Sequence, residues 1–186
     1  PTFTCTAEPR AAFVTRGVLR ILQWNADGVS TKIPELEARI QEYECDIIAI
    51  QESKLQSKNK TPQIQGFTPV RKDRRIKPGQ TETRGGGLLT FVKDDIPFNV
   101  VDSAEQAEDS DMEVLAIQLR AGTEGVIRIV NVYCPPSRGA STADILQTEY
   151  LPHSKRDVIC ADMNAHSVPW DREQPEDGRG EEVEEW

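Results

Sequence analysis

The chain has 186 residues, a hydrophobic content of 37%, an aromatic content of 6% and a formal net charge of −9 at pH 7. This length suffices for one domain with a buried core, and the acidic balance argues against a generally basic nucleic-acid binder. Because the chain shows no run of eighteen apolar residues and no signal peptide, we expect no membrane span and an intracellular location.

Four cysteines are spread along the chain without a C-x-x-C pair, at Cys5, Cys45, Cys134 and Cys160. Three of them lie beside apolar runs, which predicts reduced, mostly buried thiols. Only two histidines accompany them, and no ligand pairs are closely spaced, so the sequence argues against a zinc site.

Charge is distributed unevenly. Residues 171–186 carry eight acidic and two basic residues, a net charge of −6 that leaves −3 for the remainder. Residues 71–84 carry the opposite excess, in six basic residues: Arg71, Lys72, Arg74, Arg75, Lys77 and Arg84. This run is either a solvated loop or a local patch that contacts phosphate on an otherwise acidic protein.

The first third of the chain predicts a strand, a helix and a second strand. Residues 1–17 are polar and are interpreted as an irregular N-terminal arm, followed by an alternating strand over 18–24. Ser30 or Thr31 is expected to cap a helix that has Pro34 in its first turn and ends near Glu44. A buried strand over 46–50 then delivers Gln51 and Glu52, an order typical of α/β folds.

The middle of the chain consists mostly of predicted strands, over 67–71, 88–92, 98–101, 113–119 and 126–133. Strands that follow one another without helices favour mixed or antiparallel sheets. The glycines of 85–87 are interpreted as the tight entry to a central strand, because no Lys-Ser/Thr follows them as in a nucleotide P-loop. A hairpin turn is expected over 122–125, and helices are expected over 143–151 and from 179 onward.

A short apolar strand over 158–161 leads directly to Asp162 and Asn164. Residues two apart at a strand end project to the same side. The carboxylate can hold a divalent cation or take a proton from water, and the carboxamide can donate to a phosphate oxygen. This pairing suits phosphoester hydrolysis, although Asp and Asn are also ordinary turn residues.

Similar polar residues follow the other apolar strands, namely Asn25, Glu52 and Tyr133. If these strand ends meet at one edge of a sandwich, two carboxylates and several hydrogen-bonding groups converge there. Such an oxygen-rich set favours a hard cation, Mg²⁺ or Mn²⁺.

These motifs, Trp24-Asn25, Gln51-Glu52, Asn131-Val132-Tyr133 and Asp162-Met163-Asn164, resemble in order those of the endonuclease/exonuclease/phosphatase superfamily. Further motifs are similar to the apurinic/apyrimidinic-like endonuclease domain of non-LTR, LINE-type retrotransposons: Tyr133-Cys134-Pro135-Pro136, Gly85-Gly86-Gly87, Asp111-Met112-Glu113-Val114, and Asn164-Ala165-His166 with Trp170. The resemblance implies a four-layered α/β sandwich over 18–186, in which helices flank two mixed β-sheets. It also implies a domain that nicks target DNA, precedes a reverse transcriptase in the same polypeptide and works in the nucleus.

The resemblance also implies a role for each site residue. Glu52 would be the main metal ligand, and Asn25 would orient metal or phosphate. Tyr133 would place its hydroxyl on the scissile phosphate, Asp162 would orient or deprotonate water, and Asn164 would donate to the phosphoryl oxygen. The six cations of 71–84, together with His166, would contact DNA.

One departure from the family concerns the C-terminal side. The chain lacks the family's Ser-Asp-His motif, so we expect a C-terminally truncated domain. Two alternatives to an active endonuclease therefore stay open. The chain could be an inactive remnant, or it could be a superfamily phosphatase or phosphodiesterase that acts on a non-DNA phosphoester.

Overall fold

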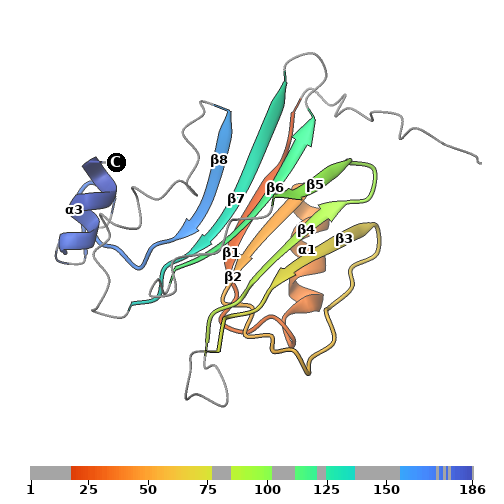
Figure 1. The fold of residues 1–186 in the computed structure, drawn as a ribbon, viewed down its shortest axis with the longest axis horizontal. Coiled ribbons are helices and arrows are strands. Elements are labelled where there is room, and N and C mark those ends of the chain that lie inside the picture. Colours follow the sequence, from red (N-terminus) through yellow and green to blue (C-terminus); the bar gives the residue numbers. More distant parts are fainter. Residues whose placement is uncertain are drawn as a thin grey trace, which may run out of the picture.

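The computed structural model describes residues 18–76, 85–101, 112–120, 125–136, 156–170, 172–173, 175 and 177–185. Two four-stranded sheets pack face to face (Figure 1). The first has the order β1-β2-β4-β3, and its strands are β1 (Ile21–Asn25), β2 (Ile47–Gln51), β3 (Phe67–Lys72) and β4 (Leu88–Lys93). The second has the order β5-β6-β7-β8, and its strands are β5 (Phe98–Val101), β6 (Glu113–Arg120), β7 (Val126–Tyr133) and β8 (Asp157–Asp162).

Both sheets are mixed, as predicted. β1 and β2 are parallel because α1 (Ile33–Tyr43) connects them as a crossover, whereas β4 is antiparallel to both of its neighbours. In the second sheet β5, β6 and β7 are antiparallel and β8 runs parallel to β7. The predicted α/β sandwich of two mixed sheets is therefore confirmed.

Three apolar layers hold the sandwich together. In β2 the side chains alternate, so that Ile47 and Ala49 lie in the cluster between the sheets while Ile48 and Ile50 lie in the cluster under α1. All five residues of β2 are buried, which explains its continuous apolar run. On the outer face of the second sheet, Val183 of α3 (Gly178–Glu185) packs against a third cluster. Among the described helices, none is long and apolar enough to cross a membrane.

Helix α1 begins later than the sequence suggested. Its N-cap residue is Lys32, which makes no side-chain capping bond, so the expected cap at Ser30 or Thr31 is wrong. The reason is the proline: Pro34 occupies the first turn, where its fixed φ and missing N–H are tolerated, and it sets the start of the helix. The helix ends as expected beside Glu44, which adopts a left-handed conformation with φ of 50°.

Several strands differ by a few residues from the expected ranges, and two of these shifts affect the site. Asn25 and Asp162 are the last residues of β1 and β8, so the sheet itself orients both side chains. The predicted arm over 1–17, the helix over 143–151 and most of the turn over 122–125 lie outside the described residues.

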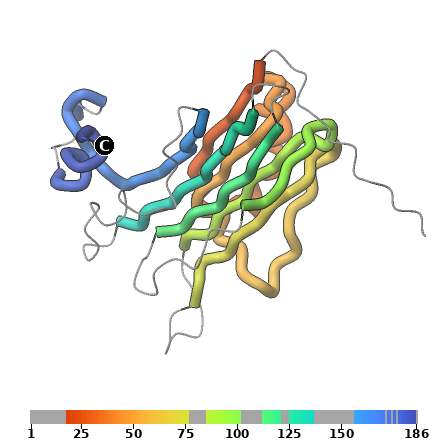
Figure 2. The backbone as a smooth tube through the Cα atoms, turned by 45° about the horizontal axis from the view of Figure 1, so that its top comes forward, coloured from red at the N-terminus to blue at the C-terminus, as the bar shows by residue number. Residues whose placement is uncertain are grey.

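The strand ends that carry the candidate residues gather at one edge of the sandwich. In the first sheet Asn25 pairs in register with Gln51, and Glu52 follows at once. In the second sheet Tyr133 pairs with both Asp162 and Glu113. Figure 2 shows the strands of the two sheets in two layers, with α3 beyond the β8 side. The predicted convergence of strand ends therefore occurs.

Candidate active site

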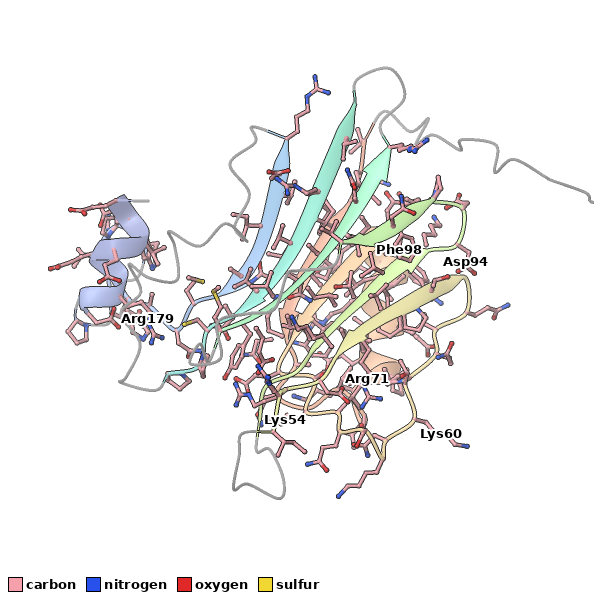
Figure 3. All side chains as sticks on the ribbon, viewed as in Figure 1. Lys54, Lys60, Arg71, Asp94, Phe98 and Arg179 are labelled. Carbon is pink, nitrogen blue, oxygen red and sulfur yellow. The ribbon has the colours of Figure 1, made fainter. Side chains whose placement is uncertain are left out.

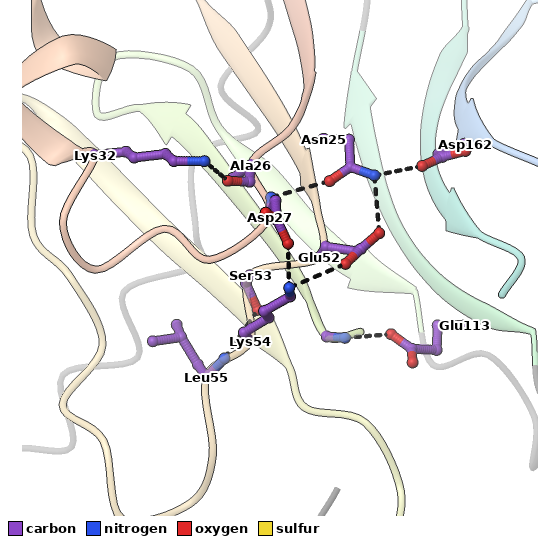
Figure 4. A network of polar contacts seen from close by, with 11 residues as sticks. Asn25, Ala26, Asp27, Lys32, Glu52, Ser53, Lys54, Leu55, Glu113 and Asp162 are labelled. Atoms are coloured by element: carbon purple, nitrogen blue, oxygen red, sulfur yellow. Dashed lines mark hydrogen bonds and ion pairs between the residues drawn. The ribbon is translucent and has the colours of Figure 1, made fainter. Parts of the chain in front are cut away.

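Asn25 joins the predicted metal ligand, Glu52, to the predicted catalytic carboxylate, Asp162, across the two sheets (Figure 4). Its Nδ2 donates to Glu52 Oε1 at 3.0 Å and to Asp162 Oδ2 at 2.5 Å. Its Oδ1 accepts from the backbone N–H of Asp27 at 3.0 Å. Because the carbonyl side of the amide is occupied by that N–H, the amide nitrogen must face the carboxylates. Asn25 therefore fixes the spacing of Glu52 and Asp162.

Backbone hydrogen bonds on both sides hold the segment that carries Glu52. Gly28 N–H donates to the carbonyl of Glu52 at 2.8 Å, and Ser53 N–H donates to the carbonyl of Gly87 at 2.9 Å. Glu52 has a φ of 49°, a conformation uncommon for a residue with a side chain. Gly87 also has a positive φ, and a Cβ there would meet the Ser53 hydroxyl at 2.7 Å. Gly87 thus allows a close backbone approach at the entry to β4. Because β4 lies between β2 and β3, this agrees with the predicted tight entry to a central strand.

An ion pair beside Glu52 was not recognised from the sequence. The ammonium of Lys54 pairs with the carboxylate of Asp27 and lies 3.6 Å from Glu52 Oε2. The hydrogen bond from Lys54, and then its charge, lower the pKa of Asp27. Asp27 is absent from the predicted site residues, although its position two residues after Asn25 is the signal that could identify it.

Tyr133 is buried at the end of β7, with 4% of its surface exposed. Burial, and then the charge and hydrogen bonding of Glu52, raise the pKa of its hydroxyl to about 12. The guanidinium carbon of Arg74 lies 5.4 Å from the centre of the tyrosine ring, a cation–π arrangement. The phenol is therefore neutral at physiological pH and retains its proton as a hydrogen-bond donor.

A second buried carboxylate, Glu113, holds Arg74 in this position. Glu113 Oε1 accepts from Arg74 Nε at 2.5 Å, and its Oε2 accepts from Gly87 N–H at 2.5 Å. Burial raises the pKa of Glu113, and the guanidinium of Arg74 opposes this shift. Glu113 lay in a recognised motif, but its role as the anchor for Arg74 depends on contacts between strands that the sequence does not show.

The Asp162–Asn164 pair forms a turn and lines the site at the same time, so the two interpretations of these residues are compatible. Asn164 N–H donates to Asp162 Oδ1 at 3.1 Å, and Asn164 Nδ2 donates to the carbonyl of Cys134 at 2.9 Å. Asn164 has a φ of 47°, which suits an Asn in a turn. Both residues line a hollow of about 530 Å³ that also contains Asn25, His166 and Trp170.

The predicted DNA-contacting cations occupy different environments. Arg71 donates to the carbonyls of Asn59 and Gln56 and forms an ion pair with Asp73. Lys72 donates to the carbonyl of Val114 at 2.8 Å, and burial lowers its pKa. Figure 3 shows Arg71 beside the loop that carries Lys60, and Lys54 at the site edge. Three of the six cations, including Arg74, thus make contacts within the protein.

Of the other four residues predicted to contact DNA, the structure describes two. Arg75 is exposed and His166 lines the hollow. Lys77 and Arg84 lie outside the described residues.

The donor set at this edge suits a hard divalent cation. Glu52 and Asp162 supply carboxylate oxygens, the ligands that Mg²⁺ prefers, and Mg²⁺ commonly takes one or two carboxylates with water completing its shell. In the described part of the chain, no group of three or more His, Cys, Asp and Glu side chains is placed to hold a metal ion. The two carboxylates therefore fit a magnesium ion whose remaining ligands would be water molecules.

The described cysteines agree with the expectation of buried thiols. Cys45, Cys134 and Cys160 are buried outside any disulfide. Burial raises the pKa of Cys160 to about 11, so this thiol is protonated and unreactive at neutral pH. Cys5 lies outside the described residues.

Comparisons with known proteins identify a family and a relative. The model of the Endonuclease/Exonuclease/phosphatase family matches residues 22–184. The probable RNA-directed DNA polymerase from transposon X-element of Drosophila melanogaster is 30% identical over 152 residues, which make up 82% of this chain. The match covers 16% of that relative's length, so the chain corresponds to a small part of it.

Solved structures share the fold. The endonuclease domain of TRAS1, a telomere-specific non-LTR retrotransposon, matches with a TM-score of 0.63 and 18% identity, over 90% of this chain and 68% of that one. The catalytic domain of Xenopus laevis APE2 matches with a TM-score of 0.54 and 18% identity, over 87% of this chain and 63% of that one.

Proposed function

The chain belongs to the endonuclease/exonuclease/phosphatase family, and we propose that it is the divalent-metal-dependent endonuclease domain of a non-LTR retrotransposon. In this proposal the domain nicks target DNA by phosphodiester hydrolysis, and the nick primes reverse transcription. The observation that carries the proposal is the Asn25 amide, which bridges Glu52 and Asp162 where the strand ends of both sheets meet. The transposon polymerase of the Drosophila relative supports a reverse transcriptase in the same polypeptide. We propose that the domain acts in the nucleus, where its target DNA would lie.

Each residue has a separate task in this reaction. Glu52 would hold Mg²⁺ or Mn²⁺, and when bound the ion would neutralise charge on the phosphate. Asp162 would orient the attacking water and accept its proton, as the water oxygen bonds to phosphorus and the bond from phosphorus to the 3′ oxygen breaks. The 3′ oxygen then takes up a proton from solvent water, and Asp162 releases its proton to solvent, which leaves a 3′-hydroxyl and a 5′-phosphate.

Two neutral donors would stabilise the charge that develops on the phosphoryl oxygens. Tyr133 suits this task because its raised pKa, about 12, keeps the hydroxyl protonated. Asn164 donates one amide N–H to the carbonyl of Cys134, and we assign its second N–H to a phosphoryl oxygen. Asn25 would act as the orienting residue, since its carbonyl oxygen already accepts from Asp27.

The remaining cations of residues 71–84 are proposed to contact the DNA backbone. Arg75 is exposed and His166 lines the hollow, and we propose that both contact DNA, as do Lys77 and Arg84 of the same basic run. Arg71, Lys72 and Arg74 would add positive potential while their side chains stay in internal contacts.

The test is nicking of supercoiled plasmid DNA by the 186-residue chain. We expect nicking with Mg²⁺, no nicking with EDTA, and loss of nicking in Asp162→Asn, which keeps the side-chain shape and removes the base. Asp94→Asn is a matched control, because Asp94 accepts from Thr68 at the opposite edge of the first sheet. No nicking by a folded chain with Mg²⁺ or Mn²⁺ would refute the proposal for this chain and favour an inactive remnant. Hydrolysis of a non-DNA phosphoester alone would favour the phosphatase alternative.

A further inference from the structure

Helix α3 is tied to the turn that carries Asp162 and Asn164 by an unusual concentration of polar contacts. Arg179 Nη1 donates to three backbone carbonyls, those of Met163 at 2.9 Å, Pro135 at 3.1 Å and Asn164 at 3.2 Å. Two of these carbonyls belong to the turn after β8, and the third belongs to the segment after β7. One side chain therefore joins the exits of the two strands that supply Asp162 and Tyr133.

The same two exits are joined directly as well. Cys134 N–H donates to the carbonyl of Asp162 at 2.8 Å, and Asn164 Nδ2 donates back to the carbonyl of Cys134 at 2.9 Å. Asn164 and Arg179 thus bind the consecutive carbonyls of Cys134 and Pro135. The three carbonyls share the two N–H groups of Nη1, and the positive charge of the guanidinium lets Arg179 hold carbonyls that would otherwise repel one another.

Close packing fixes the helix against the turn at a second point. Asp177 N–H donates to the carbonyl of His166 at 3.0 Å, and Asp177 Oδ1 accepts from Gly180 N–H at 2.7 Å. A Cβ atom at Gly180 would overlap the carbonyl of His166, whereas a Cβ atom at Gly178 would meet open space. Gly180 is therefore required for the close approach of α3, and Gly178 is not.

We propose that Arg179 is a positioning residue, and that α3 serves to hold the Asp162–His166 turn in its working geometry. Asn164 has a left-handed backbone conformation, and Arg179 binds the carbonyls of both Met163 and Asn164, which flank that residue's backbone. Figure 3 places Arg179 at the end of α3 nearest the strand exits. This inference rests on the proposed nuclease function for its kinetic consequence, while its structural part stands independently.

The test compares Arg179→Ala, Arg179→Lys and Gly180→Ala with two controls, Arg172→Ala and Gly178→Ala. The first readout is amide hydrogen exchange at Cys134 and Asn164, whose N–H groups both bond to Asp162. We expect exchange about tenfold faster in Arg179→Ala and Gly180→Ala, and no change in either control. Alanine favours helices over glycine by about 1 kcal/mol at either position, so faster exchange in Gly180→Ala alone would separate turn contact from helix propensity.

The second readout is the kinetics of plasmid nicking. We expect Arg179→Ala to lower kcat about 100-fold and to leave KM within about twofold, because the turn is displaced and DNA contacts are kept. Arg179→Lys keeps the charge and the N–H donors on a shorter side chain, so we expect it to retain more of kcat than Arg179→Ala. Added guanidinium ion should restore kcat to Arg179→Ala and should not restore it to Gly180→Ala.

The outcomes separate the two proposals. A raised KM with unchanged kcat would assign Arg179 to DNA binding and overturn the inference, as would unchanged hydrogen exchange in Arg179→Ala. If the wild-type chain does not nick DNA, the proposed function fails, and the exchange measurement still decides whether α3 holds the turn.

Discussion

The side chains of Gln51 and Asn131 meet inside the sandwich, where Gln51 Nε2 donates to Asn131 Oδ1 at 2.7 Å. The two residues lie in different sheets, on β2 and β7. Asn131 also donates to the carbonyl of Ile50 and to the hydroxyl of Thr90, both in the first sheet. These directional bonds set the register of one sheet against the other directly below the candidate site, a task that apolar contacts alone perform less specifically.

Removing the Asn131 amide should therefore cost stability. We expect Asn131→Ala to lower the free energy of unfolding by about 2–3 kcal/mol, because the buried amide of Gln51 loses its side-chain partner. Urea denaturation measures this change, and Asn99→Ala on the exposed face of β5 is the control. A double-mutant cycle with Gln51→Ala should give a coupling of about 1 kcal/mol or more. Strict additivity would show that the pair does not link the sheets.

The Tyr133 hydroxyl should matter for catalysis and for alkaline stability. We expect Tyr133→Phe to lower kcat for nicking by about 100-fold, because one preorganised donor to the phosphate is lost. The raised pKa means that the folded state retains the phenolic proton, so the stability tied to it is present below pH 10 and is lost as pH rises from 10 to about 12.

Denaturation of wild type and Tyr133→Phe at a series of pH values tests the second part of this prediction. The wild type should lose stability relative to the variant as pH rises above 10. An equal response of both proteins to alkaline pH would contradict the burial of this hydroxyl beside Glu52.

Lys54 should weaken metal binding. Its ammonium lies 3.6 Å from Glu52 Oε2, so it opposes the arrival of a second cation at that carboxylate. We expect Lys54→Met to lower the Mg²⁺ concentration for half-maximal nicking about three- to tenfold, a modest effect because the pair is partly exposed. Titration calorimetry with Mg²⁺ checks the affinity without turnover, and Lys58→Met is the control. A higher Mg²⁺ requirement would mean that Lys54 mainly orients Glu52.

Much of the fold could be predicted because the strands are apolar runs separated by turn residues. β5 and β7 occupy the ranges that the sequence suggested, and the site edge was predictable because Asn25, Glu52 and Tyr133 each follow or end such a run. The start of α1 was not predictable from capping residues, because Pro34 sets it locally.

The partners of charged residues could not be predicted in the same way. A sequence shows that Arg71, Lys72 and Arg74 form a basic run, but their contacts with the 56–61 loop, Val114 and Glu113 depend on how distant segments come together. The partners of Arg179 could not be predicted for the same reason. They are three backbone carbonyls, and nothing near Arg179 in the sequence identifies them.

The basic segment should therefore divide into structural and DNA-contacting cations. Arg75→Ala, combined with Lys77→Ala and Arg84→Ala, should weaken DNA binding and reduce the slope of log affinity against log salt by about 0.9 for each phosphate contact removed. Arg71→Ala should instead lower the free energy of unfolding by about 1–3 kcal/mol, because the carbonyls of Gln56 and Asn59 lose a charged donor.

Fluorescence anisotropy of a labelled duplex over a range of KCl concentrations, in EDTA to prevent cleavage, measures the slopes, and urea denaturation measures stability. The two sets of variants act as controls for each other, since each should change one quantity and spare the other. An unchanged slope after the triple substitution would remove this segment from the DNA surface. A reduced slope in Arg71→Ala with unchanged stability would place that side chain on the DNA. Unchanged stability would show that the Arg71 contacts with residues 56–61 contribute little to folding.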